Sequence, residues 1–329
     1  MMFTDIIGHA RAKEVLTRVL AGRTVPAGLL FSGPAGVGKR RVADAFVRAW
    51  LCLEESGAPC GRCASCTHPS GKAHPDRLEV VPEEKKKSIG VDQVRELSAW
   101  IAQTPARGRR KAVVVDPADA LGLEAANALL KTLEEPPPGS VIVLVASRPG
   151  SLPATVRSRC QQVSFGPLTD EQVAEVLRRH LWPAQAARQA AALAEGSPGA
   201  ALARDGRVWQ EAADAVGSLL ERLAGGDRGA ALAFAEGIGE GRERTLAALQ
   251  ALIASVRMAA RWRLGDRTGA AGAPAEALRR LGAERLCRLL AEALELHRRL
   301  EGGDRPPNVK LALATLLAPV SAEGAGRWC

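Results

Sequence analysis

Short apolar segments recur along the first half of the chain and alternate with segments whose apolar residues have helical spacing. The apolar segments predict β-strands at residues 28–33, 77–82, 111–116, 140–147 and 161–165. Helical spacing predicts helices at residues 41–51, 91–103 and 123–135, the last of which ends at three consecutive prolines. Strands that alternate with helices indicate a parallel sheet covered on both faces. The predicted fold class of this half is therefore α/β.

Beyond residue 166 the pattern predicts helices and turns. Thr169 or Asp170 is the expected N-cap of the first of them. Segment 265–275 is rich in Gly and Ala and is predicted to be a loop. One apolar stripe is typical of helical packing, and it consists of Leu286, Leu289, Leu290, Ala293, Leu296 and Leu300. These changes divide the chain into predicted domains at 1–166, 167–207 and 208–329.

The composition is that of a globular protein, with 47% hydrophobic and 25% charged residues among 329. The net charge is +9, and basic residues exceed acidic ones by 8 to 3 in residues 1–50 and by 10 to 5 in residues 251–300. Such regions fit either a phosphate-bearing partner or solvated helix faces. Aromatic residues make up only 3%, which argues against gripping single strands by base stacking.

The chain shows no uninterrupted apolar run long enough to span a membrane. The first residues, "MMFTDIIGHARAKEVL", have charges early and no apolar core of a secretory signal. We therefore expect a cytoplasmic protein without a membrane partner.

A Gly-rich loop lies between the first predicted strand and the helix after it. Its sequence, "GPAGVGKRR", supplies Gly33, Gly36, Gly38 and Lys39 at the spacing of a phosphate-binding P-loop. The position after the lysine ordinarily carries a Ser or Thr hydroxyl that binds Mg²⁺, and here it is Arg40. The loop therefore has the pattern of a nucleotide site but lacks one metal ligand.

Four cysteines cluster shortly after this helix, and the remaining three, Cys160, Cys287 and Cys329, are scattered. Two overlapping C-x-x-C turns and one upstream thiol match a structural, tetrahedral Zn²⁺ site. A disulfide is a weak alternative in a cytosolic chain, and a redox C-x-x-C would not need four thiols. The predicted zinc ligands are Cys52, Cys60, Cys63 and Cys66.

Several motifs together resemble the AAA+ clamp-loader family, and more narrowly the bacterial DNA polymerase III clamp loader. They are the Gly-rich loop, the cysteine cluster, a strand that ends in Asp116, "NALLKTLEEPP" at 127–137 and "SRC" at 158–160. The resemblance implies an AAA+ P-loop domain at 1–166 with a zinc module at 52–66. It also implies a helical lid at 167–207 and an all-α collar at 208–329 that assembles a hetero-pentamer, although the match there rests only on "NVKLALATLL" and helical character.

The resemblance also shows which parts of an ATPase are present. Lys39, Asp116 and the sensor Ser147 are retained, whereas active relatives have a Glu at the position of Pro117. Pro198 and Gly199 stand where active relatives carry a basic sensor. ATP and Mg²⁺ are possible ligands, but hydrolysis by this chain is not expected because metal seating and positioning provide most of phosphoryl-transfer catalysis.

Arg159 is the strongest candidate functional residue. The resemblance implies that it is an arginine finger, which enters the ATP site of a neighbouring subunit, with Ser158 and Cys160 shaping its loop. A guanidinium suits this role because it is always charged and binds phosphate bidentately. Arg157 is the rival candidate and Arg148 a more distant one. Judged without the resemblance, an Arg in this segment would be an ordinary surface residue.

The predicted function is that of a non-catalytic clamp-loader subunit, which supplies Arg159 in trans and helps load the sliding clamp onto primed DNA. Its expected partners are the gamma/tau ATPase and delta subunits, with the clamp and DNA reached through the complex. Any polymerase activity belongs to the holoenzyme rather than to this chain. Two alternatives remain open, an active gamma/tau-type ATPase and a zinc-dependent nucleic-acid-binding protein.

Glu134 and Glu135 lie at the end of a predicted helix. The helix dipole disfavours anions there by about 0.3–1 kcal/mol each. Either they contact a basic partner surface or a neighbouring subunit, or they are solvated without a role.

Overall fold

The computed structural model describes residues 3–22, 26–54, 58–68, 74–83, 86, 88–203, 206–227, 229–238, 241–265, 276–301 and 308–321. Apart from Gly265, the predicted loop at 265–275 lies outside these residues. The chain divides into two compact units, residues 1–168 and 169–329. The predicted boundary at residue 207, between a lid and a collar, stays a prediction.

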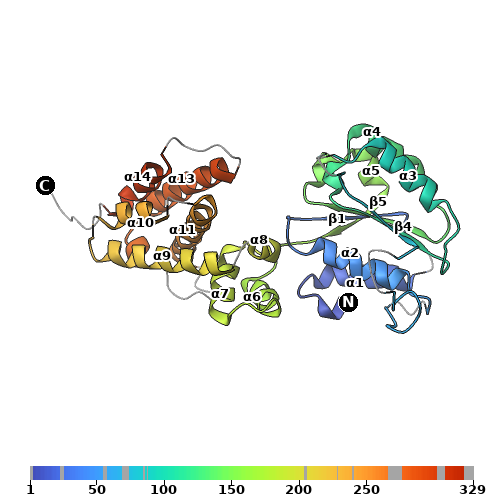
Figure 1. Ribbon diagram of the computed structural model, residues 1–329, viewed down its shortest axis with the longest axis horizontal. Coiled ribbons are helices and arrows are strands. Elements are labelled where there is room, and N and C mark those ends of the chain that lie inside the picture. Colours follow the sequence, from blue (N-terminus) through green and yellow to red (C-terminus); the bar gives the residue numbers. More distant parts are fainter. Residues whose placement is uncertain are drawn as a thin grey trace. The chain divides into compact units, whose positions relative to one another are not determined.

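A five-stranded parallel sheet forms the centre of the first unit, with the strand order β2-β3-β4-β1-β5 (Figure 1). The strands agree with the predicted segments to within one or two residues, and the α/β fold class is confirmed. Their bounds are Gly28–Ser32 for β1, Arg77–Val80 for β2, Lys111–Val115 for β3, Ser140–Ala146 for β4 and Cys160–Ser164 for β5.

Helices cover both faces of this sheet: α1 and α2 lie on one face, and α3, α4 and α5 on the other (Figure 1). The helices are α1 Ala10–Ala21, α2 Lys39–Trp50, α3 Val91–Ile101, α4 Leu123–Glu134 and α5 Ala154–Ser158. Three single 3-10 turns accompany them at Phe3–Asp5, Ala118–Ala120 and Pro149–Ser151.

The alternating side chains of each strand explain the two layers of core. In β1, Leu29 and Phe31 belong to the core under α1 and α2, whereas Leu30 belongs to the core under α3 and α4. All five residues of β1 are buried. A strand covered on both faces needs apolar residues at every position, which is why these segments read as continuous apolar runs.

Every described element of the second unit is a helix. Thr169 caps α6 as predicted, because its hydroxyl accepts a hydrogen bond from the backbone N–H of Gln172. The bounds are α6 Asp170–Arg179, α7 Ala184–Leu193, α8 Pro198–Leu202, α9 Gly206–Ala224, α10 Ala230–Ile238, α11 Arg242–Arg263, α12 Glu276–Arg279, α13 Ala283–Glu301 and α14 Val309–Ser321.

The predicted apolar stripe lies on α13. Five of its six residues are buried and Leu290 is partly buried, and all six belong to a core shared with α9, α10, α11 and α14. Within the described part of the chain, no helix has the length and apolar character that crossing a membrane requires.

Candidate functional site

The Gly-rich loop connects the end of β1 to the start of α2. Gly33, Gly36 and Gly38 have φ angles of 153°, 72° and 107°, which favour glycine. A Cβ at Gly33 would also lie only 2.1 Å from the backbone oxygen of Phe165. The loop thus has the backbone that a phosphate-binding loop requires, and it leads into the N-terminus of a helix, where anions are favoured.

Lys39 is buried against this loop. Its Nζ donates hydrogen bonds to the backbone oxygens of Gly33 and Pro34 at 2.7 and 2.6 Å, and to the hydroxyl of Ser147 at 3.1 Å. The structure therefore brings together Lys39 and Ser147, two of the predicted nucleotide-site residues. Burial lowers the pKa of Lys39, while the nearby Asp119 and Asp116 oppose this effect.

Ser147 is itself held by Asp119, which was not among the predicted site residues. The Asp119 carboxylate accepts hydrogen bonds from the backbone N–H groups of Ser147 at 2.7 Å and Arg148 at 3.0 Å. These bonds hold the backbone that follows β4 close to the end of the loop lysine.

The Arg40 guanidinium contacts three carboxylates. Its Nε donates to Asp44 at 3.0 Å, one terminal nitrogen lies 3.2 Å from an oxygen of Asp116, and the other lies 2.8 Å from an oxygen of Glu79. Only 24% of the Arg40 side chain is exposed. Arg40 is therefore not an ordinary surface residue of the helix.

Arg77 completes this acid cluster, which we define as Arg40, Asp44, Arg77, Glu79 and Asp116. A terminal nitrogen of Arg77 lies 2.5 Å from Asp44, and its side chain is only 5% exposed. Burial raises the pKa of Asp116, and hydrogen bonding to Arg40 opposes that rise. Sequence reasoning missed Asp44, Arg77 and Glu79.

These residues do not fit a magnesium ion. Mg²⁺ is bound through carboxylates and other oxygen ligands in an octahedral arrangement. Here the hydroxyl ligand is absent and a permanently charged guanidinium already pairs with Asp116. A divalent cation next to Arg40 would meet like charge, so the chemistry of this cluster argues against the Mg²⁺–ATP that hydrolysis requires.

His9 also lies against the loop and was missed by the sequence analysis. Its Nε2 is 2.8 Å from the backbone oxygen of Val37, and its ring meets the Phe165 ring edge-on at a centroid distance of 5.0 Å. Burial lowers the pKa of His9; the hydrogen bond with Val37 opposes this, and the charges of Lys13 and Lys39 add to the lowering. A neutral His9 that donates to Val37 supports the outer side of the loop.

Arg159 directly follows α5 and is partly exposed. One terminal nitrogen donates to the backbone oxygen of Thr155 at 3.0 Å, and the other lies 2.5 Å from an oxygen of Glu134. Ser158 bonds the same Thr155 oxygen at 3.0 Å. Cys160 is a buried core residue at the start of β5, where burial raises its thiol pKa to about 11.

Strand register places Arg159 far from the Gly-rich loop of its own chain. Cys160 pairs with Gly28 at the start of β1, whereas the loop follows Ser32 at the end of that strand. At about 3.3 Å per residue, some 13 Å of strand separates the two ends. Arg159 therefore lies at the end of the sheet where β1 and β5 begin, whereas Lys39 lies beyond the end of β1.

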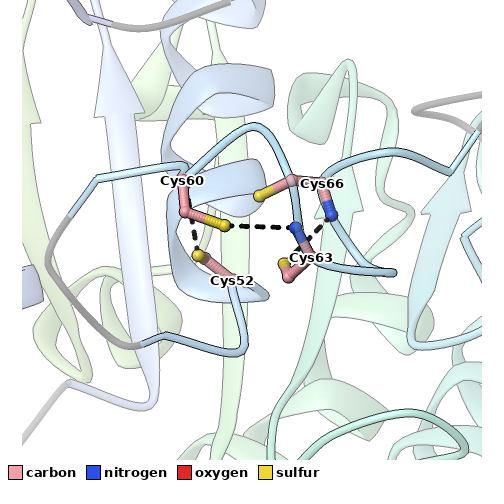
Figure 2. Close-up of side chains that lie close together, drawn as sticks. All are labelled: Cys52, Cys60, Cys63 and Cys66. Carbon is pink, nitrogen blue, oxygen red and sulfur yellow. Dashed lines mark hydrogen bonds between the residues drawn. The ribbon is translucent and has the colours of Figure 1, made fainter.

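The four clustered cysteines converge from the loop after α2, as Figure 2 shows. Their sulfur atoms all lie within 4.8 Å of one another. Backbone N–H groups of Cys60, Cys63 and Cys66 donate to the sulfurs of Cys52, Cys60 and Cys63 at 3.3–3.4 Å.

This cluster fits a zinc ion. Zn–S bonds of about 2.3 Å in a tetrahedron place sulfurs about 3.8 Å apart, which the observed spacing accommodates. Bonds from N–H groups favour the thiolate form that zinc binding needs. The loop is also attached to the domain, because Arg48 donates to the backbone oxygen of Cys66 at 2.9 Å and Ser65 bonds His74 at 2.7 Å.

Comparison with known proteins finds a family whose model matches the first part of the chain. Residues 8–169 match the model described as DNA polymerase III, delta subunit. The region contains the Gly-rich loop, the acid cluster, the four cysteines and Arg159, so every site described above is a feature of the family-matched domain.

Curated relatives agree. The delta-prime subunit of DNA polymerase III from Pseudomonas aeruginosa is 41% identical over 191 residues, which cover 56% of this chain and 58% of that protein. The Escherichia coli delta-prime subunit is 39% identical and covers 55% of each chain. The Bacillus subtilis tau subunit is 31% identical over 52% of this chain and 30% of its own length.

The chain spans a little over half the length of the first two of these relatives. The predicted resemblance to the bacterial DNA polymerase III clamp loader is confirmed, and within it the delta-prime subunits above are 39–41% identical to this chain. For the second unit, the lid and collar stay predictions.

Proposed function

We propose that this chain is a non-catalytic, delta-prime-like subunit of the DNA polymerase III clamp loader. It supplies Arg159 to the ATP site of a neighbouring gamma/tau subunit and helps load the sliding clamp onto primed DNA within a hetero-pentamer that includes delta. The zinc ion is structural, and the helical second unit provides the lid and the collar that joins subunits.

The position of Arg159 carries this proposal. The side chain is partly exposed and lies at the sheet edge opposite the Gly-rich loop of its own chain. It therefore cannot complete the nucleotide site of its own chain. A partly exposed guanidinium at this end of the sheet suits contact with a phosphate on another subunit.

The acid cluster supports the non-catalytic part. Arg40 pairs with Asp116, and Pro117 stands where a water-polarising carboxylate is needed. An active gamma/tau-type ATPase would release phosphate as an isolated chain. We expect the isolated chain to release none above background, and turnover at the rate of a motor subunit would contradict the proposal.

The decisive experiment reconstitutes the complex with gamma/tau and delta and compares Arg159→Ala with Arg157→Ala. We expect Arg159→Ala to assemble normally and to lose most of the DNA-stimulated ATP hydrolysis. The loss at the neighbouring site should approach the roughly 10³-fold effect of removing an arginine finger. Normal hydrolysis by Arg159→Ala, or a loss confined to Arg157→Ala, would remove this assignment.

A further inference from the structure

The ion pair between Glu134 and Arg159 joins two features that the sequence left separate. Glu134 is the last residue of α4, and Arg159 follows α5. Their charged atoms lie 2.5 Å apart, with side-chain exposures of 47% and 36%. The helix dipole disfavours an anion at this C-terminus, and Arg159 of the same chain provides the compensating positive charge.

Stability does not explain this pair well. Ion pairs between partly exposed side chains contribute little to folding, and holding two long side chains in one geometry costs entropy. The observed geometry instead restricts the guanidinium. Arg159 is held at two points, the oxygen of Thr155 and the carboxylate of Glu134.

Two-point attachment leaves the guanidinium able to bind a second anion. Each terminal nitrogen of an arginine carries two N–H groups, and Nε carries another. With one bond from each terminal nitrogen committed, three N–H groups remain as donors to phosphate oxygens. A side chain fixed before the encounter loses less freedom when that contact forms.

We propose that Glu134 is a positioning residue for Arg159: it orients the guanidinium toward a phosphate group on the neighbouring subunit. This inference rests on the proposed function of Arg159. The adjacent Glu135 is the natural control, because it is exposed and has no ion pair among the described residues.

The test measures DNA-stimulated ATP hydrolysis of the reconstituted complex with Glu134→Gln, Glu135→Gln, Arg159→Ala or the double variant Glu134→Gln/Arg159→Ala. We expect Glu134→Gln to lower kcat about tenfold, since small misplacements of a catalytic group have large effects. KM for ATP should change little, because an arginine finger acts in the transition state. Glu135→Gln should match the unmodified complex.

The double variant separates positioning from a structural role. If Glu134 acts through Arg159, Glu134→Gln causes no further loss once Arg159 is alanine, whereas a structural defect would persist. The charge-retaining variant Glu134→Asp should recover part of the activity lost in Glu134→Gln. Melting temperatures of the purified chains confirm that each variant is folded.

The outcomes distinguish the two proposals. If Arg159→Ala leaves hydrolysis unchanged, the proposed function itself fails. If Arg159→Ala reduces hydrolysis but Glu134→Gln behaves like Glu135→Gln, only the positioning inference fails. Faster hydrolysis with Glu134→Gln would overturn it too, because the carboxylate would then restrain Arg159 rather than orient it.

Discussion

At position 40 a single residue changes the chemistry of the acid cluster next to the Gly-rich loop. A hydroxyl there would leave three carboxylates available to a metal, whereas Arg40 contacts Asp44, Glu79 and Asp116 directly. A guanidinium serves this purpose because it stays charged when partly buried and its planar fork reaches several oxygens at once. The counter-ion of the acidic residues is thus built into the chain.

Arg40→Thr should lower the free energy of unfolding by about 2–4 kcal/mol, because it leaves three neighbouring carboxylates opposed mainly by Arg77, with Lys39 acting on Asp116. Magnesium chloride should raise the melting temperature of this variant more than that of the unmodified protein, since a cation can then replace the guanidinium. Thermal unfolding with and without magnesium checks this, with the exposed neighbour Arg41→Thr as the control. Equal magnesium effects on both proteins would contradict the model of an internal counter-ion.

At the scale of elements, the segment between α2 and β2 has no described helix or strand. Such a segment cannot hold its conformation through backbone ladders, so the four cysteines and a few side-chain bonds must do so. A zinc ion would supply much of this stabilisation, because its binding energy becomes folding energy for the loop.

We expect purified protein to contain one zinc ion per chain. Cys63→Ser should lose it and lower the melting temperature, because the remaining thiolates no longer complete a tetrahedron. Elemental analysis and thermal unfolding measure both effects. Cys287→Ser, which alters an exposed cysteine on α13, should change neither. Zinc-free protein with full stability would rule out a structural metal.

At the scale of the whole molecule, the hydrophobic cores respect the division into two units. Two cores lie within residues 6–165 and cover the two faces of the sheet, and a third lies within residues 212–320. Each unit therefore buries its own apolar surface, which is the main requirement for independent folding.

A fragment of residues 1–168 should consequently fold by itself. Because both of its cores are complete, we expect a single cooperative thermal transition by circular dichroism and retention of the zinc ion. A broad, non-cooperative transition would show that the first unit needs the helical unit for its stability. The full-length chain provides the reference transition.

The sequence alone was enough to predict the strands, most of the helices of the first unit and the Gly-rich loop. These features depend on local pattern: buried strands need continuous apolar runs, and positive φ angles need glycine. The convergence of the four cysteines was also predictable, because zinc ligands follow characteristic spacings.

Tertiary structure alone decided which polar groups far apart in the sequence meet. Arg40 reaches Glu79 on β2, Arg159 reaches Glu134 on α4, and Asp119 holds Ser147 after β4. These partners are separated by 25 or more residues, so no local pattern relates them. Only strand order and register bring them together, and the same register separates Arg159 from the loop of its own chain. Residue identity thus determined the available chemistry, whereas folding determined which groups act on one another.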